Sequence, residues 1–68
     1  MPKRKLNRIK AVLAENNVTN RELASELEVT ETSVSRWCTN DMQPSIETLF
    51  EIAKVLDVDI RELLVSTK

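Results

Sequence analysis

Residues 20–39 read NRELASELEVTETSVSRWCT, and two short amphipathic patterns follow one another in this stretch. Apolar residues recur at helical spacing at Leu23 and Leu27 in the first half, and at Val34 and Trp37 in the second. Three residues separate the two predicted helices. A link this short is typical of a helix-turn-helix, in which the helices cross steeply and one face of the second helix projects from the body.

The same helical period continues on both sides of this pair, and no segment alternates with the period of two that a half-buried strand requires. Helices are predicted over residues 5–16, 20–27, 31–39, 46–56 and 60–65. Their apolar stripes consist of Leu6, Ile9 and Val12 or Leu13; Leu23, Ala24 and Leu27; Ile46, Leu49, Phe50, Ala53 and Leu56; and Ile60, Leu63 and Leu64. We therefore expect an all-α fold in which five helices form one compact bundle.

The predicted helix ends carry their own signals. Thr30 and Ser45 are candidate N-caps, and Thr19 and Asp59 are each followed three residues later by a glutamate, which is the spacing of a capping box. These residues stand directly before four of the five predicted helices. Side-chain caps of this kind satisfy backbone N–H groups that the first turn of a helix leaves without a partner.

The chain contains no glycine, the residue that most often ends a helix in the left-handed conformation. Asn17, Asn40 and Asp57 stand just after predicted helices, and asparagine and aspartate tolerate that conformation best after glycine. Glu28 follows the helix over residues 20–27 and lacks that tolerance. We therefore expect backbone strain or a different turn geometry at Glu28.

The length and composition of the chain exclude several classes of protein. With 68 residues there is room for a single small core, and no apolar run approaches the roughly 20 residues of a membrane span. The basic start lacks the apolar segment of a secretory signal, so we expect a cytoplasmic protein. A single cysteine and no histidine offer no internal disulfide, zinc site or Cys–His catalytic pair. No metal, cofactor, membrane or small-molecule substrate is therefore expected.

The formal net charge of −1 hides two unlike halves. Residues 1–40 carry seven Lys or Arg against five Asp or Glu, a net charge of +2, whereas residues 41–68 carry three against six, a net charge of −3. Half of the ten basic residues lie within the first ten positions, and Lys3, Arg4 and Lys5 form a basic arm. Such an arm suits an anionic partner, although a solvated chain end has the same composition.

The helix predicted over residues 31–39 has two unlike faces when its residues are placed about 100° apart. Val34 and Trp37 form the apolar side, which we assign to the core. The opposite side carries short polar side chains and one guanidinium, from Thr32, Ser35, Arg36 and Thr39. Cys38 lies between the two faces and is interpreted as a half-buried filler.

This polar side can read base edges in the DNA major groove, which admits one α-helix. Arg36 can donate two hydrogen bonds to guanine O6 and N7, a contact worth about 1–3 kcal/mol of discrimination, while Thr32 and Ser35 can donate and accept. Glu31 has two interpretations, because it can accept from cytosine N4 or stabilise the first turn of its helix through the helix dipole. A polar helix face is also often only solvated.

Further polar residues are candidates for contacts with DNA phosphates. The start of the helix over residues 20–27 presents N–H groups that suit a phosphate, and the loop after residue 39 offers a second anchor. The candidate phosphate contacts are Thr19, Asn20, Arg21, Thr39, Asn40 and Gln43, together with the basic arm. With so few cations, a single copy of the chain is expected to bind weakly.

Residues 18–64, VTNRELASELEVTETSVSRWCTNDMQPSIETLFEIAKVLDVDIRELL, resemble the Cro/cI-like helix-turn-helix family, also called the xenobiotic-response-element type. The resemblance rests on SVSRW, PSIETL and VDIRELL and on the apolar skeleton Ile9, Val18, Leu23, Ala24, Leu27, Val29, Val34, Trp37, Leu49, Ala53, Leu56 and Val58. It implies a five-helix bundle of the phage-repressor type that acts as a sequence-specific transcription regulator. It also implies a homodimer on a two-fold symmetric operator of double-stranded DNA.

Carried over by position, the family's base-reading sites fall on Glu31, Thr32, Ser35 and Arg36. Its polar contact at the start of the second helix falls on Asn20, where glutamine is more usual, and its backbone contacts in the following loop fall near Thr39 and Asn40. The chain departs from the family where glycine is preferred, at positions 17, 28, 40 and 57, and where an acidic residue is replaced by Cys38. The departure at Glu28 puts the angle between the second and third helices in doubt.

Two functions are consistent with these patterns. The first is a transcription regulator, expected to be a repressor, with a basic arm over residues 1–5 and a DNA-binding domain over residues 6–65. The second is a protein-interaction module, such as an antitoxin or adaptor, that keeps the fold and binds a protein through the acidic half. An enzyme is not expected, because no histidine, glycine-rich loop or nucleophile–base pair is present.

Overall fold

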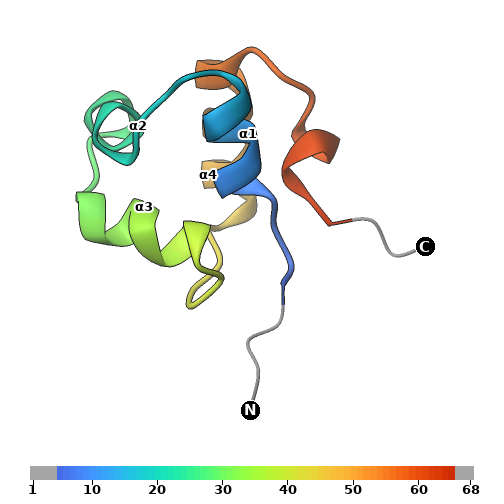
Figure 1. Ribbon diagram of the computed structural model, residues 1–68, viewed down its shortest axis with the longest axis horizontal. Helices are drawn as coiled ribbons and strands as arrows, with labels where there is room; N and C mark the ends of the chain where they lie inside the picture. The colour runs from blue at the N-terminus through green and yellow to red at the C-terminus, as the bar shows by residue number, and fades with distance from the viewer. Residues whose placement is uncertain (1–4, 66–68) are drawn as a thin grey trace.

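The computed structural model describes residues 5–65, which form four α-helices and one short 3₁₀-helix. The elements are α1 (Ile9–Glu15), α2 (Asn20–Leu27), α3 (Glu31–Cys38), α4 (Ile46–Leu56) and η1 (Ile60–Leu63). In Figure 1, α2 and α3 lie on one side, α1 and α4 occupy the middle, and η1 lies on the other side. None of the helices within residues 5–65 is both long and apolar enough to cross a membrane.

The expected all-α fold is confirmed, but the expectation of five α-helices is wrong in its last element. Residues Ile60–Leu63 form a single 3₁₀ turn, in place of the helix predicted over residues 60–65. The chain becomes extended directly afterwards, at Leu64, where it forms an isolated antiparallel bridge with Asn7. A four-residue segment that must then pair with an extended strand has no room for the i to i+4 hydrogen bonds of an α-helix.

The same pairing shortens the first helix. The sequence predicted a helix from residue 5, whereas α1 begins at Ile9. The N–H of Arg8 donates to the carbonyl of Leu63 at 2.8 Å, and that of Val65 donates to the carbonyl of Leu6 at 3.3 Å. Backbone groups that bond to a distant segment are unavailable to a helix, so residues 5–8 stay outside α1.

All four predicted capping residues act as caps. The side chains of Thr19, Thr30 and Ser45 each accept from the backbone N–H three residues later, which begins α2, α3 and α4. Asp59 caps η1 with a complete capping box. Each cap is worth about 1 kcal/mol, so the starts of these short helices are set locally.

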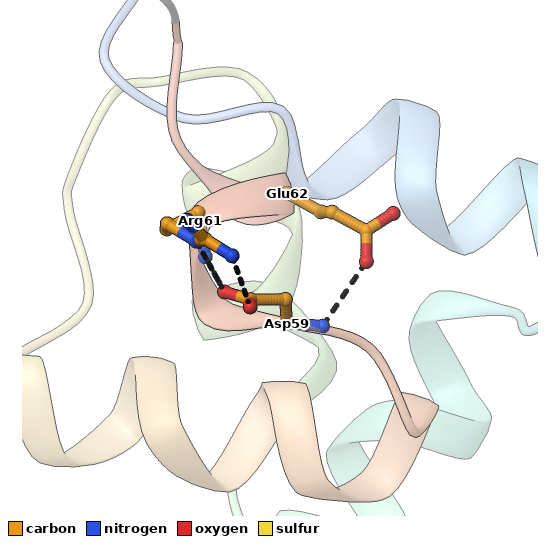
Figure 2. Close-up of polar contacts among 3 residues, drawn as sticks. All are labelled: Asp59, Arg61 and Glu62. Carbon is orange, nitrogen blue, oxygen red and sulfur yellow. Dashed lines mark hydrogen bonds and ion pairs between the residues drawn. The ribbon is translucent and has the colours of Figure 1, made fainter.

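Figure 2 shows how closely the start of η1 is tied together. The guanidinium of Arg61 donates to both carboxylate oxygens of Asp59, at 3.1 and 2.9 Å, while a carboxylate oxygen of Glu62 accepts from the Asp59 backbone N–H at 3.0 Å. The hydrogen bond from Arg61 lowers the pKa of Asp59 below its ordinary value. The stabilisation from this pair is therefore present at neutral pH and is lost as the pH falls through the Asp59 titration.

Left-handed residues end all four α-helices. Asn17, Glu28, Asn40 and Asp57 have φ angles of 55, 57, 61 and 54°. At each end the following N–H donates five residues back, as Val29 does to the carbonyl of Ala24 at 3.0 Å, which is the Schellman pattern. The strain expected at Glu28 is thus present, because this residue bears a Cβ in a conformation that disfavours one.

The core lies between the helices and contains both predicted anchors of α3. Val34 is fully buried and Trp37 nearly so. The buried apolar residues are Ile9, Val12, Leu13, Leu23, Ala24, Val34, Trp37, Leu49, Ile52, Ala53, Leu56 and Leu63. Each large side chain of this set stabilises the fold by about 1.5–3 kcal/mol.

The predicted stripe of α4 is wrong at two positions. Ile46 and Phe50 are 66% and 59% exposed, whereas Ile52, which lay outside the stripe, is fully buried. The buried side of α4 is centred on residues 49, 52, 53 and 56, so it is rotated away from Ile46 and Phe50. Leu6 and Leu64 are also exposed, at 47% and 43%, and both lie where the two chain segments pair outside the α-helices.

Asn7 is the one buried polar residue among those that the structure describes, at 3% exposure. Its Nδ2 donates to the carbonyl of Trp37 at 3.0 Å and to Oε1 of Gln43 at 2.7 Å. Its Oδ1 accepts from the N–H of Ile9 at 3.1 Å, which begins α1. One side chain therefore links the start of α1 to the end of α3 and to the loop beyond it.

Replacing Glu28 by glycine removes the Cβ from a left-handed residue. We expect Glu28→Gly to raise the free energy of unfolding by about 0.5–1 kcal/mol, since the relieved strain exceeds the added entropy of the unfolded chain. Urea unfolding followed by Trp37 fluorescence measures this change. The control is Glu26→Gly inside α2, which should lower the free energy of unfolding by about 0.5–1 kcal/mol. Equal losses in both variants would contradict the strain at Glu28.

Replacing Asn7 by alanine removes the hydrogen-bond partner of the Trp37 carbonyl and of the Ile9 N–H, both in buried hydrogen bonds, and of the partly buried Oε1 of Gln43. We expect Asn7→Ala to lower the free energy of unfolding by about 2–3 kcal/mol, and the melting temperature by at least roughly 8 °C. Thermal unfolding followed by circular dichroism tests this. The control is Asn16→Ala at the exposed end of α1, which removes one hydrogen bond, from Nδ2 to the carbonyl of Val12 at 2.8 Å, and should lower the free energy of unfolding by only about 0.5–1 kcal/mol. A melting temperature for Asn7→Ala equal to that of the control would show that the network adds nothing.

Candidate nucleic-acid interface

The turn between α2 and α3 is built from local interactions on both of its sides. The left-handed Glu28 ends α2 with its N–H donating to the carbonyl of Ser25 at 3.3 Å. Thr30 begins α3 by accepting from the N–H of Ser33 at 3.1 Å. The two helices are therefore separated by Glu28, Val29 and Thr30, as the sequence predicted. Figure 1 shows α3 crossing below α2 with one side turned away from the rest of the molecule.

The outward side of α3 borders a shallow groove of about 510 Å³. It is lined by four residues of α3 and by Asn20 of α2, the α3 residues being Glu31, Thr32, Ser35 and Arg36. All four α3 residues are exposed. The groove thus brings together every base-reading residue predicted from the sequence, and it adds the predicted contact at the start of α2.

Asn20 is oriented by a contact from α3. Its Oδ1 accepts a hydrogen bond from the Sγ of Cys38 at 3.5 Å. Burial raises the pKa of the Cys38 thiol, and the nearby charge of Lys10 lowers it by less, so the thiol keeps its proton at neutral pH and can donate. Cys38 is half-buried, as expected, and it connects the two helices where the family has an acidic residue.

The remaining candidate phosphate contacts lie at the two helix ends that border the groove. Thr19 is occupied as the cap of α2, because its Oγ1 accepts from the N–H of Glu22 at 3.1 Å. Arg21 follows on the exposed side of α2. The hydroxyl of Thr39 donates to the carbonyl of Arg36 at 3.3 Å and to a carboxylate oxygen of Asp41 at 3.1 Å, which ties the end of α3 to the loop.

The side chains of Asn40 and Gln43 are already engaged within the protein. Oδ1 of Asn40 accepts from the N–H groups of Leu6 and Asn7 and from Nε2 of Gln43, at 2.9, 3.0 and 3.0 Å. Nδ2 of Asn40 donates to the carbonyl of Asn7 at 3.4 Å. Each side-chain amide has two N–H groups, so one on each residue remains for a partner beyond these bonds.

The basic arm is described only in part. Lys3 and Arg4 lie outside the described residues, whereas Lys5 is exposed and follows them into the structure. Arg8, close behind, makes an ion pair with Glu15 at 3.6 Å and donates to the carbonyl of Glu62 at 3.3 Å. Residues 5–65 hold no group of three His, Cys, Asp or Glu side chains that could bind a metal ion.

Sequence reasoning missed the part played by Asn7. The residue lies inside a segment that was predicted to be helical, where an asparagine would be an ordinary exposed position. The distant partners Trp37 and Gln43 make it a buried network, and no local pattern indicates them. The only available signal was the polar loop at residues 39–43, which needs partners for its backbone and side chains.

Known proteins share both the sequence pattern and this geometry. A family model described as helix-turn-helix matches residues 9–63. Five chains of solved structures match, and one is a crystal structure from Bacteroides fragilis of a protein named a presumed DNA-binding protein. It is 50% identical, covers 88% of this chain and 97% of its own, and superposes with a TM-score of 0.87. No curated protein matches this chain.

The family match spans all of α1 to η1, including the crossing of α2 and α3 and the residues that line the groove. Eleven of the twelve skeleton residues that prompted the resemblance in the sequence are buried or packed against the core, and the exception is Val29, which is 38% exposed. This chain therefore belongs to the helix-turn-helix family of the Cro/cI, or xenobiotic-response-element, type.

Proposed function

We propose that the chain is a sequence-specific DNA-binding transcription regulator whose α3 enters the major groove. One observation carries the proposal above all: the exposed polar side chains of α3 share one groove with Asn20 of α2. Side chains that are short, exposed and hydrogen-bonding suit the edges of base pairs. The name of the related protein from Bacteroides fragilis, at 50% identity, supports the same function.

Arg36 is the main base reader in this proposal. It lies in the last turn of α3, is exposed, and is the only guanidinium among the residues that line the groove. Its planar pair of donors matches guanine O6 and N7. Thr32 and Ser35 add contacts whose direction adapts to the base, and Glu31 either accepts from cytosine or stabilises the first turn.

Backbone contacts flank the reading face in the proposed complex. Thr19, Asn20 and Arg21 approach one phosphate at the start of α2, and Thr39, Asn40 and Gln43 approach another beyond α3. The remaining amide N–H groups of Asn40 and Gln43 are the donors that the loop would use. Residues 6–65 form the binding domain, arranged as in phage repressors with η1 in fifth place, and residues 1–5 form the arm.

The proposed regulator binds as a homodimer to a two-fold symmetric operator in the cytoplasm and represses the gene it controls. A single copy offers few cations, so it neutralises few phosphates and gains little affinity for DNA from the release of counterions. Two copies on adjacent half-sites double the number of contacts. Such half-sites lie one helical turn apart, about 34 Å, or a multiple of it.

A protein-interaction module, such as an antitoxin or adaptor, is the second candidate, and one observation favours it. Ile46 and Phe50 lie one turn apart on α4, are mostly exposed, and stand beside the carboxylates of Glu47 and Glu51. Exposed apolar side chains with a charged rim are typical of protein interfaces. This candidate predicts weak DNA binding with a shallow salt dependence and a protein that co-purifies.

Removing the Arg36 guanidinium should reduce sequence discrimination rather than general affinity. With a duplex selected from a random library, we expect Arg36→Ala to lose about 1–3 kcal/mol of preference over a duplex whose contacted guanine is replaced. Arg36→Lys should restore little of it, because an ammonium lacks the two-pronged geometry. Fluorescence anisotropy measures both affinities. Failure to select any consensus, or unchanged discrimination in Arg36→Ala, would rule out the proposal.

The selected sequences also test the two-fold arrangement. We expect a palindromic consensus whose half-sites are separated by about 10–10.5 base pairs or a multiple. Sedimentation of the complex should give two protein chains per duplex, whereas a duplex with a single half-site should bind one chain more weakly. A consensus without symmetry, bound by one chain, would contradict the homodimer.

A further inference from the structure

A second hollow opens beside the groove, between the start of α1 and the end of α3. Its volume is about 370 Å³, and its lining includes three small side chains, those of Ala11, Ala14 and Cys38. The lining also includes three cations, from Lys5, Arg8 and Lys10, and no acidic residue. We call this feature the cationic cavity. Its local charge is opposite in sign to the net charge of the whole chain.

The cationic cavity adjoins the groove that carries the predicted base readers. Cys38 lines the cavity, and its thiol donates to Asn20, which lines the groove. Lys10 is close enough to Cys38 for its charge to act on the thiol. A duplex seated on α3 would therefore bring its backbone past the rim of the cavity.

Two of the three cations are available to a ligand. Arg8 is held by Glu15 and by the carbonyl of Glu62. Within residues 5–65 the structure records no hydrogen bond or ion pair for the ammonium of Lys5 or of Lys10. A cation that is not neutralised by a neighbour can replace a counterion on an incoming phosphate.

The backbone that presents Lys5 is held in place before any ligand arrives. The N–H groups of Leu6 and Asn7 donate to Oδ1 of Asn40 at 2.9 and 3.0 Å. These hydrogen bonds hold the segment that follows Lys5 against the end of α3. Lys10 lies in the first turn of α1, next to Ile9, whose N–H donates to Oδ1 of Asn7 at 3.1 Å. Holding both lysines on ordered backbone reduces the entropy lost when they bind.

We infer that the cationic cavity binds a phosphate of the DNA backbone, with Lys10 and Lys5 as its cations, next to the phosphate expected at the start of α2. The inference rests on the proposed function and names a contact with the backbone that comes from α1. Lys10 then supplies affinity without sequence preference, since phosphates are the same in every sequence. A small phosphate-bearing molecule has the same chemistry, so the experiment must separate the two sources.

The test measures the affinity of the full chain for the selected duplex and for a scrambled duplex between 50 and 300 mM NaCl. The variants are Lys10→Gln, Lys5→Gln and Lys10→Arg. The matched control is Lys54→Gln, which removes the same charge from an exposed position in the last turn of α4 that lines neither the groove nor the cationic cavity. Urea unfolding of each variant checks that it is folded.

We expect Lys10→Gln to weaken binding to both duplexes equally, by about five- to ten-fold at 0.1 M salt, and to reduce the slope of log K against log salt by about 0.9. Lys5→Gln should act in the same direction, and Lys10→Arg should keep the wild-type slope. Lys54→Gln should leave the slope unchanged. Discrimination between the duplexes, which reports on Arg36, should survive in all four variants.

Two results would overturn the inference while leaving the proposed function intact. The first is a Lys10→Gln slope equal to those of wild type and Lys54→Gln, with sequence discrimination preserved. The second is an unchanged slope together with saturable shifts of the Ala11 and Ala14 amide resonances when inorganic phosphate alone is added, which would assign the cavity to a small ligand. Loss of discrimination in Arg36→Ala remains the separate test of the proposed function.

Discussion

The hydrogen bonds accepted by the carboxamide oxygen of Asn40 hold the N-terminal segment against the end of α3. This oxygen accepts from the backbone of Leu6 and Asn7, which lie 34 and 33 residues earlier in the chain. Asn40 is also the left-handed residue that ends α3. The same residue therefore determines where α3 stops and which segment covers its end. The reading face depends on this arrangement, because Arg36 lies in the turn that Asn40 closes.

Burial outweighs the strain of helix ends that contain no glycine. A left-handed residue with a Cβ costs about 1–2 kcal/mol, and asparagine and aspartate reduce that cost at three of the four ends. At Glu28 nothing reduces it. The adjoining helices bury Leu23 and Val34 completely, and each such side chain contributes about 1.5–3 kcal/mol. The turn between α2 and α3 therefore keeps its geometry without glycine. Glu28 adopts the left-handed conformation at the position where the family prefers glycine.

The charge close to α3 affects binding of DNA more than the net charge of the whole chain does. Salt screens exposed charges beyond about 10 Å at 0.1 M, so a phosphate at α3 senses mainly the cations nearby. Lys5, Lys10 and Arg36 line the groove or the cationic cavity, whereas five of the six carboxylates of the acidic half lie within α4 and η1 or at their cap positions. A chain with a net charge of −1 can thus present a surface suited to DNA.

By itself, the sequence determined the starts of α2, α3, α4 and η1, the left-handed helix ends, the link of three residues and the face of α3 that holds Trp37. Each of these depends on residues within about one turn of each other, so local spacing indicates them. Tertiary structure decided the rest. It shortened α1 and reduced the fifth helix to a 3₁₀ turn, because extended residues at both ends pair with each other. It rotated α4 away from Ile46 and Phe50, buried Asn7, and brought Lys10 to Cys38, since contacts between distant segments leave no periodic trace in the chain.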